Sequence, residues 1–277
     1  CVRACPFGAV MGRSQIVDVI GKIKSQKRVV ALLAPAIVGQ FPVDLPTLVT
    51  AIRKLGFDKV IEVAVGAEIT AAREAGELSE RLERGDPFMT SSCCPAYVAA
   101  VKKHLPDLAA FVSETATPMH YAGKIAKEMA PDATTVFIGP CVAKRAEAFD
   151  DPFVDYVLTF EELGVLLSAK EIEIAKCVPS VLERPANAAA RRFAVSGGVA
   201  NAIKASATDD LRIKPVFIDG LGQKSLRILA RYAKGNCPGN LVEVMGCTGG
   251  CVGGPGVVER TKKATRRVNT FAESGET

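Results

Sequence analysis

The sequence predicts an α/β fold in which parallel β-sheets are flanked by helices. Short apolar runs alternate along the chain with segments whose apolar residues recur at helical spacing. This strand–helix–strand order is typical of parallel βαβ units, because parallel neighbours need a crossover connection. The chain has 277 residues, which is long for one compact core, so we expect one large domain or two lobes.

Two strands and three helices are predicted in the first part of the chain. Arg28–Ala34 is a short apolar run ended by Pro35, which is typical of a buried strand. Leu45–Gly56 has helical spacing, and its final glycine is a helix stop. The remaining elements are a strand at Lys59–Val65, a polar helix at Glu68–Arg84, the loop Thr90–Cys94 and a helix at Pro95–His104.

The same alternation continues through the second part of the chain. Strands are predicted at Thr134–Ile138, Val154–Leu158, Val216–Ile218 and Leu241–Val244, with helices at Glu161–Ala169 and Gln223–Ala233. Phe193–Val195 is predicted to lead as a strand into the turn 196–199, where a helix begins. We expect the polar, basic segment 259–277 to be a surface helix or a frayed tail, because a run of charges is usually solvated.

The composition narrows the classes of function. Hydrophobic residues make up 48% of the chain and charged residues 23%, as in an ordinary soluble globular protein. No apolar run reaches the roughly 18 residues of a membrane span, and the first residues lack the layout of a signal peptide. The chain has no Trp and no basic block interleaved with aromatic residues, so we expect no nucleic-acid partner. A net charge of +5 suits an acidic partner such as a small electron carrier, or simply solubility.

The nine cysteines do not form the pattern of a secreted disulfide scaffold, which is short and cysteine-dense. The adjacent pair Cys93–Cys94 also fits a disulfide framework poorly. We therefore expect metal-bound thiolates in a reducing compartment, the cytoplasm. Cys177 and Cys237 match no motif and are expected to be structural thiols.

Four cysteines lie on turns marked by glycine or proline. Cys247 and Cys251 are four residues apart within Glu243–Gly256, a run that holds six glycines. Cys94 and Cys141 lie upstream, each next to a proline. Four thiolates are the usual ligand set of a [4Fe–4S] cluster, and the three loops follow predicted strands, where open α/β sheets bind ligands. The alternative for the glycine-rich run is a loop with two buried structural thiols.

The N-terminus carries a second, incomplete cysteine pattern. Cys1, Cys5 and Pro6 match the end of the bacterial ferredoxin run, but two thiols cannot complete a four-thiolate site. We interpret residues 1–26 as the remnant of a ferredoxin-like module and a linker, with an additional upstream [4Fe–4S] cluster lost by truncation. A chain that starts at Cys1 rather than Met also suggests an excised domain.

Three segments together resemble the signature motifs of the [FeFe]-hydrogenases. TSSCCP at 90–95, GPCVAKRAE at 139–147 and EVMGCTGGCVGGPG at 243–256 are similar to the family's TSCCP, MPC-x-x-K-x-x-E and E-x-M-x-C-x-x-x-C-x-x-GG. Their order and internal spacing match, and the resemblance covers residues 27–258. It implies two lobes of parallel sheet flanked by helices, with the metal cluster between them.

The resemblance implies a ligand set for the family's cofactor, the H-cluster. Cys94, Cys141, Cys247 and Cys251 would hold its [4Fe–4S] part. Cys251 would also bridge to a two-iron subcluster with carbon monoxide, cyanide and azadithiolate ligands, which separate maturases build. Lys144 would hydrogen-bond a cyanide, a task that suits an ammonium with three donors.

Further contacts to the cofactor follow from the same resemblance. Pro35 and Ala36, with the preceding Ala34, would pack over the two-iron site. Met245 would lie beside the cluster, although a core methionine is the alternative. Glu147 would share a helical face with Lys144 and pair with a nearby cation.

The resemblance also implies a proton relay. With Cys94 assigned to iron, Cys93 keeps a thiol that can pass protons to the two-iron site, because a thiol pKa lies close enough to neutral. The relay would continue through Glu74, Ser113 and Glu77. Glu74 and Glu77 are three residues apart and share a face of a predicted helix. The alternative is a pair of solvated glutamates on an acidic helix.

Departures from the family pattern indicate a short, minimal or sensory branch. Gly139 stands where the family has methionine, and we expect it to open space beside the two-iron site. Tyr97 replaces a tryptophan, and the last motif ends in GGPG.

Three functions remain. The first is reversible oxidation of H₂ and reduction of protons, with electrons exchanged through the [4Fe–4S] part with a ferredoxin-like carrier or a partner redox domain. The second is H₂ sensing with low turnover, and the third is a non-catalytic scaffold for iron–sulfur assembly. Cys93 and Lys144 favour the first two, because a plain [4Fe–4S] carrier needs neither a proton relay nor a cyanide clamp.

Overall fold

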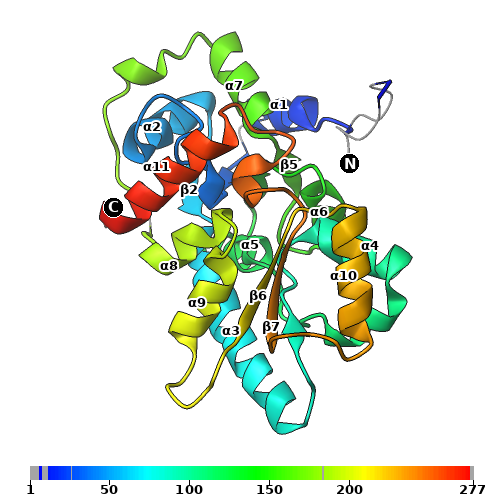
Figure 1. Cartoon of the computed structure of the whole chain (residues 1–277). Helices are drawn as coiled ribbons and strands as arrows, with labels where there is room; N and C mark the ends of the chain where they lie inside the picture. Colours follow the sequence, from blue (N-terminus) through cyan, green and yellow to red (C-terminus); the bar gives the residue numbers. More distant parts are fainter. Residues whose placement is uncertain (1–5, 8–11, 26, 183, 275–277) are drawn as a thin grey trace.

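The computed structural model describes residues 6–7, 12–25, 27–182 and 184–274, and it contains two parallel β-sheets (Figure 1). One has the strand order β2-β1-β4-β5 and the other β3-β7-β6. The strands of the first are β1 (Val29–Leu33), β2 (Lys59–Glu62), β4 (Thr134–Ile138) and β5 (Tyr156–Leu158). Those of the second are β3 (Met89–Thr90), β6 (Pro215–Asp219) and β7 (Leu241–Met245). The predicted α/β fold with two lobes of parallel sheet is confirmed.

Helices cover both sheets (Figure 1). The long helix α3 contacts α5, α8 and α9, and so packs between elements of both halves of the chain. The α-helices are α1 (Ile16–Lys24), α2 (Leu45–Leu55), α3 (Ala64–Glu83), α4 (Pro95–His104), α5 (Pro118–Met129), α6 (Lys144–Asp150), α7 (Phe160–Ala169), α8 (Ala188–Arg191), α9 (Gly198–Ser206), α10 (Gln223–Ala233) and α11 (Thr261–Ser274). Short 3₁₀ segments are η2 (Pro35–Ile37), η3 (Pro106–Phe111), η4 (Ile174–Lys176), η5 (Arg192–Ala194) and η6 (Cys251–Gly253).

Local sequence explains where the crossover helices begin and end. Asp44 caps α2 by accepting a hydrogen bond from the Thr47 backbone N–H at 2.9 Å. The helix ends at Gly56, whose φ of 112° is easily adopted only by glycine. At α7 the side chains of Thr159 and Glu162 form a capping box.

The described residues form two apolar cores. The larger core is built on β1, whose five residues are all buried, and on the helices around it. The smaller core lies under the second sheet and includes Phe88, Tyr97 and Val242. There Phe88 stacks on Phe111 with ring centroids 4.4 Å apart. Two cores let the carboxyl ends of two sheets face each other across a shared space.

Two strand predictions were wrong at the points where apolar residues do not form sheet. Residues 63–65 of the predicted strand Lys59–Val65 instead lead into α3, which therefore starts before the predicted Glu68. The start of α3 is buried against α5, where a Cβ on Gly66 would lie 2.1 Å from the Pro118 carbonyl oxygen. A short apolar run does not distinguish a buried helix from a strand. The predicted strand Phe193–Val195 is the 3₁₀ segment η5 with its C-cap.

The basic segment after Gly256 forms the ordered helix α11. Four of its side chains, Ala264, Val268, Phe271 and Ala272, are buried in contact with the larger core. Their spacing places them on one face, and the charged residues take the other. Among the helices that the structure describes, none has the length and apolar character of a membrane span. Cys1 and Cys5 lie outside the described residues.

A buried ion pair ties the segment that leads to η5 to the first sheet. Glu62, at the end of β2, accepts hydrogen bonds from Arg191 and from the Ala186 backbone N–H. Both charged side chains are almost fully buried, and the Arg191 guanidinium also lies over the ring of Phe271. The pair fixes the position of Phe193 and Ala194, which follow directly.

We expect Glu62→Gln to lower the free energy of unfolding by about 3 to 5 kcal/mol, because it leaves the buried Arg191 charge uncompensated. Urea denaturation of the variant and the wild-type chain measures this. The matched control is Glu173→Gln, which removes the exposed Glu173–Lys176 pair and should change stability by less than about 1 kcal/mol. Equal losses in the two variants would contradict the role assigned to the pair.

Candidate metal centre

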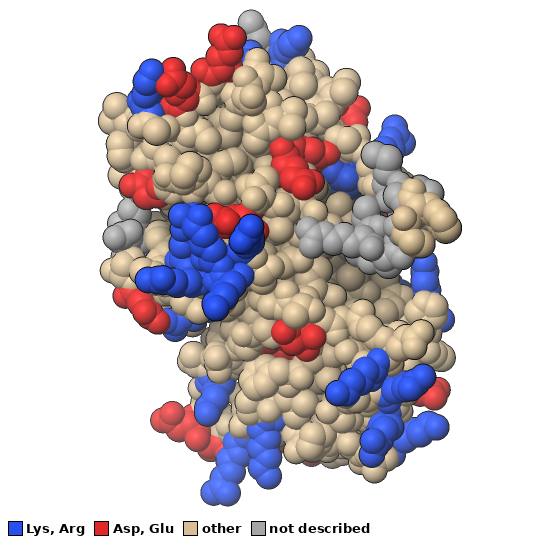
Figure 2. Space-filling view, turned by 45° about the horizontal axis from the view of Figure 1, so that its top comes forward, with Lys and Arg blue, Asp and Glu red and all other residues tan. Residues whose placement is uncertain are grey.

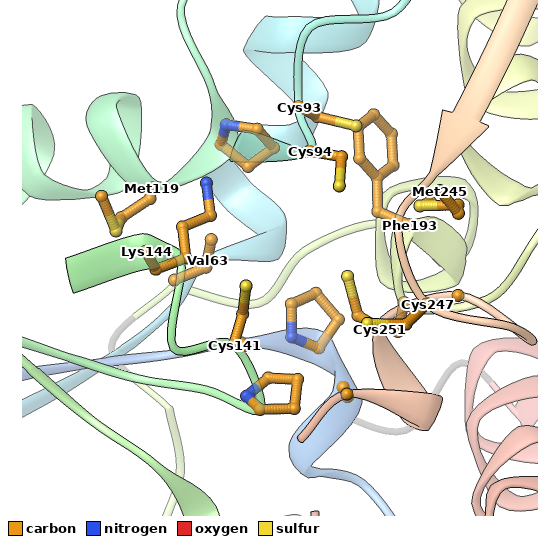
Figure 3. Close-up of a pocket in the computed structure, with 18 of the residues that line it drawn as sticks. Val63, Cys93, Cys94, Met119, Cys141, Lys144, Phe193, Met245, Cys247 and Cys251 are labelled. Carbon is orange, nitrogen blue, oxygen red and sulfur yellow. The ribbon is translucent and has the colours of Figure 1, made fainter. Parts of the chain in front are cut away.

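A cavity lies where the carboxyl ends of the strands meet (Figure 3). Its walls come from the segments that follow β1, β2, β3, β4 and β7, together with α5 and η5. The lining is apolar apart from thiols and one ammonium group. The sequence-predicted site residues on its wall are Pro35, Ala36, Cys93, Cys94, Cys141, Lys144, Met245, Cys247 and Cys251. The fold therefore places a single site at the ends of both sheets, where parallel sheets bind ligands.

Four thiols from three loops face this space. Cys94 is the N-cap of α4, Cys141 follows β4, Cys247 follows β7 and Cys251 begins η6. Figure 3 shows their sulfur atoms arranged around the same space. Burial raises the pKa of Cys251, and the charges of Cys141, Cys94 and Cys247 raise it further. The four groups are therefore within electrostatic range of one another.

Glycines bring the backbone of the last loop close to the thiols. The Gly246 backbone N–H donates to Cys94 Sγ at 3.3 Å, and a Cβ at this position would lie 3.2 Å from the same sulfur. Gly250 has a φ of 90°, and a Cβ there would lie 2.7 Å from the Ser196 nitrogen. The glycine run of this motif is thus needed for close approach and for a left-handed turn.

Glu243, the first residue of the same motif, holds two segments of the wall together. It is buried, and its carboxylate accepts from the backbone N–H groups of Gly197 at 2.6 Å and Ala200 at 2.8 Å, at the start of α9. Burial raises its pKa, and these hydrogen bonds act in the opposite direction. Glu243 therefore fixes the turn that follows Phe193 and Ala194 relative to the cysteine loop on β7. No pattern in the sequence indicates this contact between Glu243 and the start of α9.

The donor set fits an iron–sulfur cluster better than a single ion. Within the described ranges, no three His, Cys, Asp or Glu side chains are close enough to share one metal ion. A [4Fe–4S] cluster takes one thiolate at each iron, so its ligands are separated by the body of the cluster. No disulfide joins the cysteines that the structure describes, and the thiols are available as ligands.

Lys144 lies across the cavity from Cys247 and Cys251, near Val63 and Met119 (Figure 3). Its Nζ donates to both carboxylate oxygens of Glu147, at 2.8 and 2.7 Å, and to Thr117 Oγ1 at 3.3 Å. Burial lowers the pKa of Lys144, but the Glu147 carboxylate outweighs this and the pKa is raised. The cavity wall thus holds a fixed positive charge. Glu147 pairs with Lys144 itself.

The other predicted polar residues form a path along α3 that leads away from the cavity. Glu74 is fully buried, and its Oε1 accepts from the Ser92 backbone N–H at 3.1 Å and from the Ser92 hydroxyl at 3.3 Å. Ser113 donates to Glu77 Oε2 at 2.6 Å, and it stabilises the charged form of both glutamates. Glu77 lines an open hollow at the surface. Glu77 therefore faces solvent, whereas Glu74 is fully buried and is not a solvated side chain.

The acidities of these groups differ. Burial raises the pKa of Glu74 to about 7, and Glu74 Oε2 has no hydrogen-bond partner among the residues that the structure describes. Burial raises the pKa of Cys93 well above its usual value, and the charge of Glu74 adds to this. At Glu77 burial acts upward, but hydrogen bonds from Ser113, Glu114 and Thr115 lower the pKa overall. Glu74 is the group that can both hold and release a proton near neutral pH.

Several wall residues had no predicted role. Phe193, Val63, Pro118 and Met119 line the cavity, and Phe193 lies between Cys93 and Met245 in Figure 3. In the sequence, Phe193 is marked only by the glycine turn that follows it, and Pro118 only as the first residue of a helix. Met245 belongs both to the cavity wall and to the larger core.

The expectation that Gly139 opens space was wrong. A Cβ at Gly139 would lie 2.4 Å from Cε1 of Phe137, so the Phe137 ring already occupies that volume. Tyr97 is buried in the smaller core, and its hydroxyl donates to Thr90 Oγ1 at 2.7 Å.

The fold and the thiol-lined cavity are those of an iron–sulfur protein. The chain belongs to the iron-only hydrogenase family: residues 27–255 match the family model described as "Iron only hydrogenase large subunit, C-terminal domain". The resemblance in the signature motifs is thereby confirmed.

Relatives by sequence include hydrogenases and assembly proteins. Iron hydrogenase 1 of Clostridium pasteurianum is 29% identical, and the match covers 95% of this chain and 56% of the relative. The NADP-reducing hydrogenase subunit HndD of Solidesulfovibrio fructosivorans is 30% identical, with 96% and 57% covered. Cytosolic iron-sulfur assembly component 3 of Bos taurus is 24% identical over 78% of this chain. The chain spans little more than half the length of these hydrogenases.

A solved structure of the [FeFe]-hydrogenase HydA1 from Chlamydomonas reinhardtii has the same fold. The TM-score is 0.74 at 21% identity, with 94% of this chain and 88% of that chain covered.

The pKa of Glu74 predicts how stability depends on pH. Between pH 4.5 and about pH 7, the Glu74 carboxyl is protonated in the native state and ionised in the unfolded chain. The raised pKa therefore contributes fully to the free energy of unfolding below pH 4.5, and this contribution is lost as the pH rises through about 7. The stability of Glu74→Gln relative to the wild type should therefore increase by roughly 3 kcal/mol from pH 4.5 to pH 8, measured by urea denaturation. A difference that stays constant over this range would contradict the assignment.

Proposed function

We propose that the chain is the catalytic domain of an [FeFe]-hydrogenase, which reversibly oxidises H₂ and reduces protons. The observation that carries this proposal is the combination on one cavity wall of four thiols, a buried ammonium and an additional thiol, Cys93, that leads to Glu74. A simple electron carrier needs only the four thiols. The additional groups supply what proton chemistry at a buried centre needs.

The residues have separate tasks in this proposal. Cys94, Cys141, Cys247 and Cys251 would hold the [4Fe–4S] part of the H-cluster, with Cys251 bridging to the two-iron part. When bound, the H-cluster supplies the redox chemistry, in which H₂ is cleaved or formed and electrons leave or enter through the [4Fe–4S] part. Pro35 and the other apolar side chains of the wall exclude water.

Lys144 and the relay residues provide fixed and mobile charge. The Lys144 ammonium, held by Glu147, would orient an anionic cyanide ligand from the wall. Ala36 and Met245 would contact the cofactor from the other segments. Cys93 Sγ would hold the proton nearest the reaction, and Glu74 would exchange it, since its pKa is raised to about 7.

Ser113 and Glu77 would complete the proton path. Ser113 donates to Glu77 Oε2, and Glu77 opens on the surface hollow, so a proton that enters from solvent would pass from Glu77 to Ser113 on its way to Glu74. Ser92, which donates to Glu74 Oε1, orients that carboxylate at the inner end.

The electron partner we propose is an acidic, ferredoxin-like carrier or a partner redox domain. Figure 2 shows Lys and Arg gathered in a patch over α11, where Lys262, Lys263 and Arg266 are exposed. The start of α11 approaches the cysteine loop, since a Cβ on Gly249 would lie 2.6 Å from Thr261 Cγ2. A positive patch beside the centre attracts an acidic carrier. We place the protein in the cytoplasm, where maturases would build the two-iron part.

A second candidate is the assembly scaffold, favoured by the similarity to cytosolic iron-sulfur assembly component 3. A sensory role with low turnover is the third. Burying Lys144 and Glu74 costs free energy, and a scaffold that only holds a [4Fe–4S] cluster needs neither group at its site. This favours the enzyme over the scaffold.

The catalytic proposal predicts that Cys93→Ser abolishes most activity, by roughly 100-fold or more, because serine transfers protons poorly near neutral pH. The measurement is H₂ evolution from reduced viologen by the maturated chain. Cys177→Ser, at a buried cysteine away from the cavity, is the control and should keep wild-type activity. Equal low rates in the wild type and in Cys93→Ser would favour sensing.

The cofactor proposal predicts infrared bands of iron-bound carbonyl and cyanide after maturation. Because Lys144 would hold a cyanide, Lys144→Met/Glu147→Gln should lose most of these bands and keep its [4Fe–4S] absorbance. The double change leaves no buried charge unpaired. A wild-type chain with the [4Fe–4S] absorbance and no bands would support the scaffold instead.

A further inference from the structure

Gly139 and Phe137 are coupled at the wall of the cavity. They are two residues apart at the end of β4, so their side-chain positions lie on the same side of the strand. A Cβ built on Gly139 would lie 2.4 Å from Cε1 and 2.6 Å from Cζ of Phe137. Carbon atoms that are not bonded to each other are not found this close, so a side chain at position 139 would force the Phe137 ring out of its place.

Position 139 is glycine because the Phe137 ring fills the space of a side chain there, and not because the backbone needs a positive φ. Its φ lies outside the left-handed region, and its N–H donates to the Leu158 carbonyl oxygen at 3.0 Å as any residue could. The other neighbour of the missing Cβ is the Ala34 methyl carbon, at 3.1 Å. A small residue just after β1 and a glycine just after β4 therefore make room for one large ring.

The Phe137 ring belongs to the wall of the cavity that follows β1 and β4. Phe137 is only 3% exposed and lines the cavity together with Ala34, Pro35 and Ala36. The backbone joins these segments, because the Ala34 N–H donates to the Ile138 carbonyl oxygen at 2.9 Å. Under the proposed function, this is the wall beside the two-iron part.

We propose that Phe137 is a specificity-determining residue that takes over, from two positions earlier in the chain, the wall that a side chain at 139 would form. A flat, rigid ring in place of a flexible chain sets the width of this end of the cavity. It thereby controls the packing around the cofactor and the room left for small gases. The role of Phe137 beside the cofactor rests on the proposed function. The claim that Phe137 and a side chain at position 139 compete for one volume does not.

The steric part is tested on the chain without the two-iron part, through the melting temperatures of a double-mutant cycle. Phe137→Ala should lose roughly 10 °C because it leaves a cavity, and Gly139→Met roughly 5 °C because it overpacks the ring. Phe137→Ala/Gly139→Met should be more stable than Phe137→Ala, because the methionine fills the space of the ring. A double variant whose loss equals the sum of the single losses would overturn the inference.

Benzene provides an independent probe of the same volume. An apolar cavity of ring size stays dry and binds benzene. Saturating benzene should raise the melting temperature of Phe137→Ala, and leave those of the wild type and the double variant unchanged. If benzene stabilises the double variant as much as Phe137→Ala, the methionine does not occupy the space of the ring and the inference fails.

The link to the cofactor is tested by infrared spectroscopy of the maturated proteins. The carbonyl and cyanide bands should shift in Phe137→Ala and not in Phe160→Ala, which removes a fully buried ring outside the cavity wall. Bands that are present but unmoved in Phe137→Ala overturn the role of Phe137 at the site. Absence of bands from the wild type instead counts against the proposed function, and the steric cycle then decides the inference.

Discussion

The structure depends on the meeting of two parallel sheets at their carboxyl ends. Strands deliver loops to one edge of a sheet, and here the edges of two sheets face the same space, so that cysteines far apart in the chain come together. The larger apolar core reaches from the first sheet to residues of β3 and β7 in the second, and the cavity at the strand ends is lined mainly by apolar side chains and thiols. Such a space excludes water, which strengthens every charge interaction inside it.

Buried charges keep the cavity in shape, and hydrogen bonds or ion pairs satisfy most of them. Glu243 holds the start of α9 to the cysteine loop, Glu62 holds Arg191 and with it η5, and Glu147 holds Lys144. Glu74 is the exception, since one of its oxygens has no partner among the described residues and its pKa is raised to about 7. The carboxylates that fix structure are fully paired, whereas the one on the proposed proton path is left able to change its charge.

Much of the fold was predictable from local patterns, because elements with clear periodicity and punctuation need no tertiary context. The strand Thr134–Ile138 and the helices Pro95–His104 and Gln223–Ala233 were predicted with their observed bounds. The errors lie where tertiary burial replaced amphipathic patterning. The apolar start of α3 was predicted to be a strand because it is buried on all sides.

Only those site residues that belong to the signature motifs could be predicted from the sequence. The motifs named the thiols and Lys144, but the partner of Glu243 and the wall position of Phe193 depend on contacts between distant segments. Gly139 shows the same limit. A single position was interpreted as open space, while the volume was filled by Phe137, which only coordinates reveal. Spacing along a chain specifies ligands better than it specifies the space around them.

The central claim is that thiols from three loops hold one cluster. The most direct test is analysis of iron and acid-labile sulfide, with electron paramagnetic resonance of the reduced protein, after reconstitution of the whole chain and of Cys94→Ala, Cys141→Ala and Cys247→Ala. We expect the cavity of the wild type to take up about four irons and four sulfides with one resonance signal, and each variant to lose most of that signal. Cys237→Ala, outside the cavity wall, should keep it. A full cluster signal in any one of the three loop variants would contradict the claim.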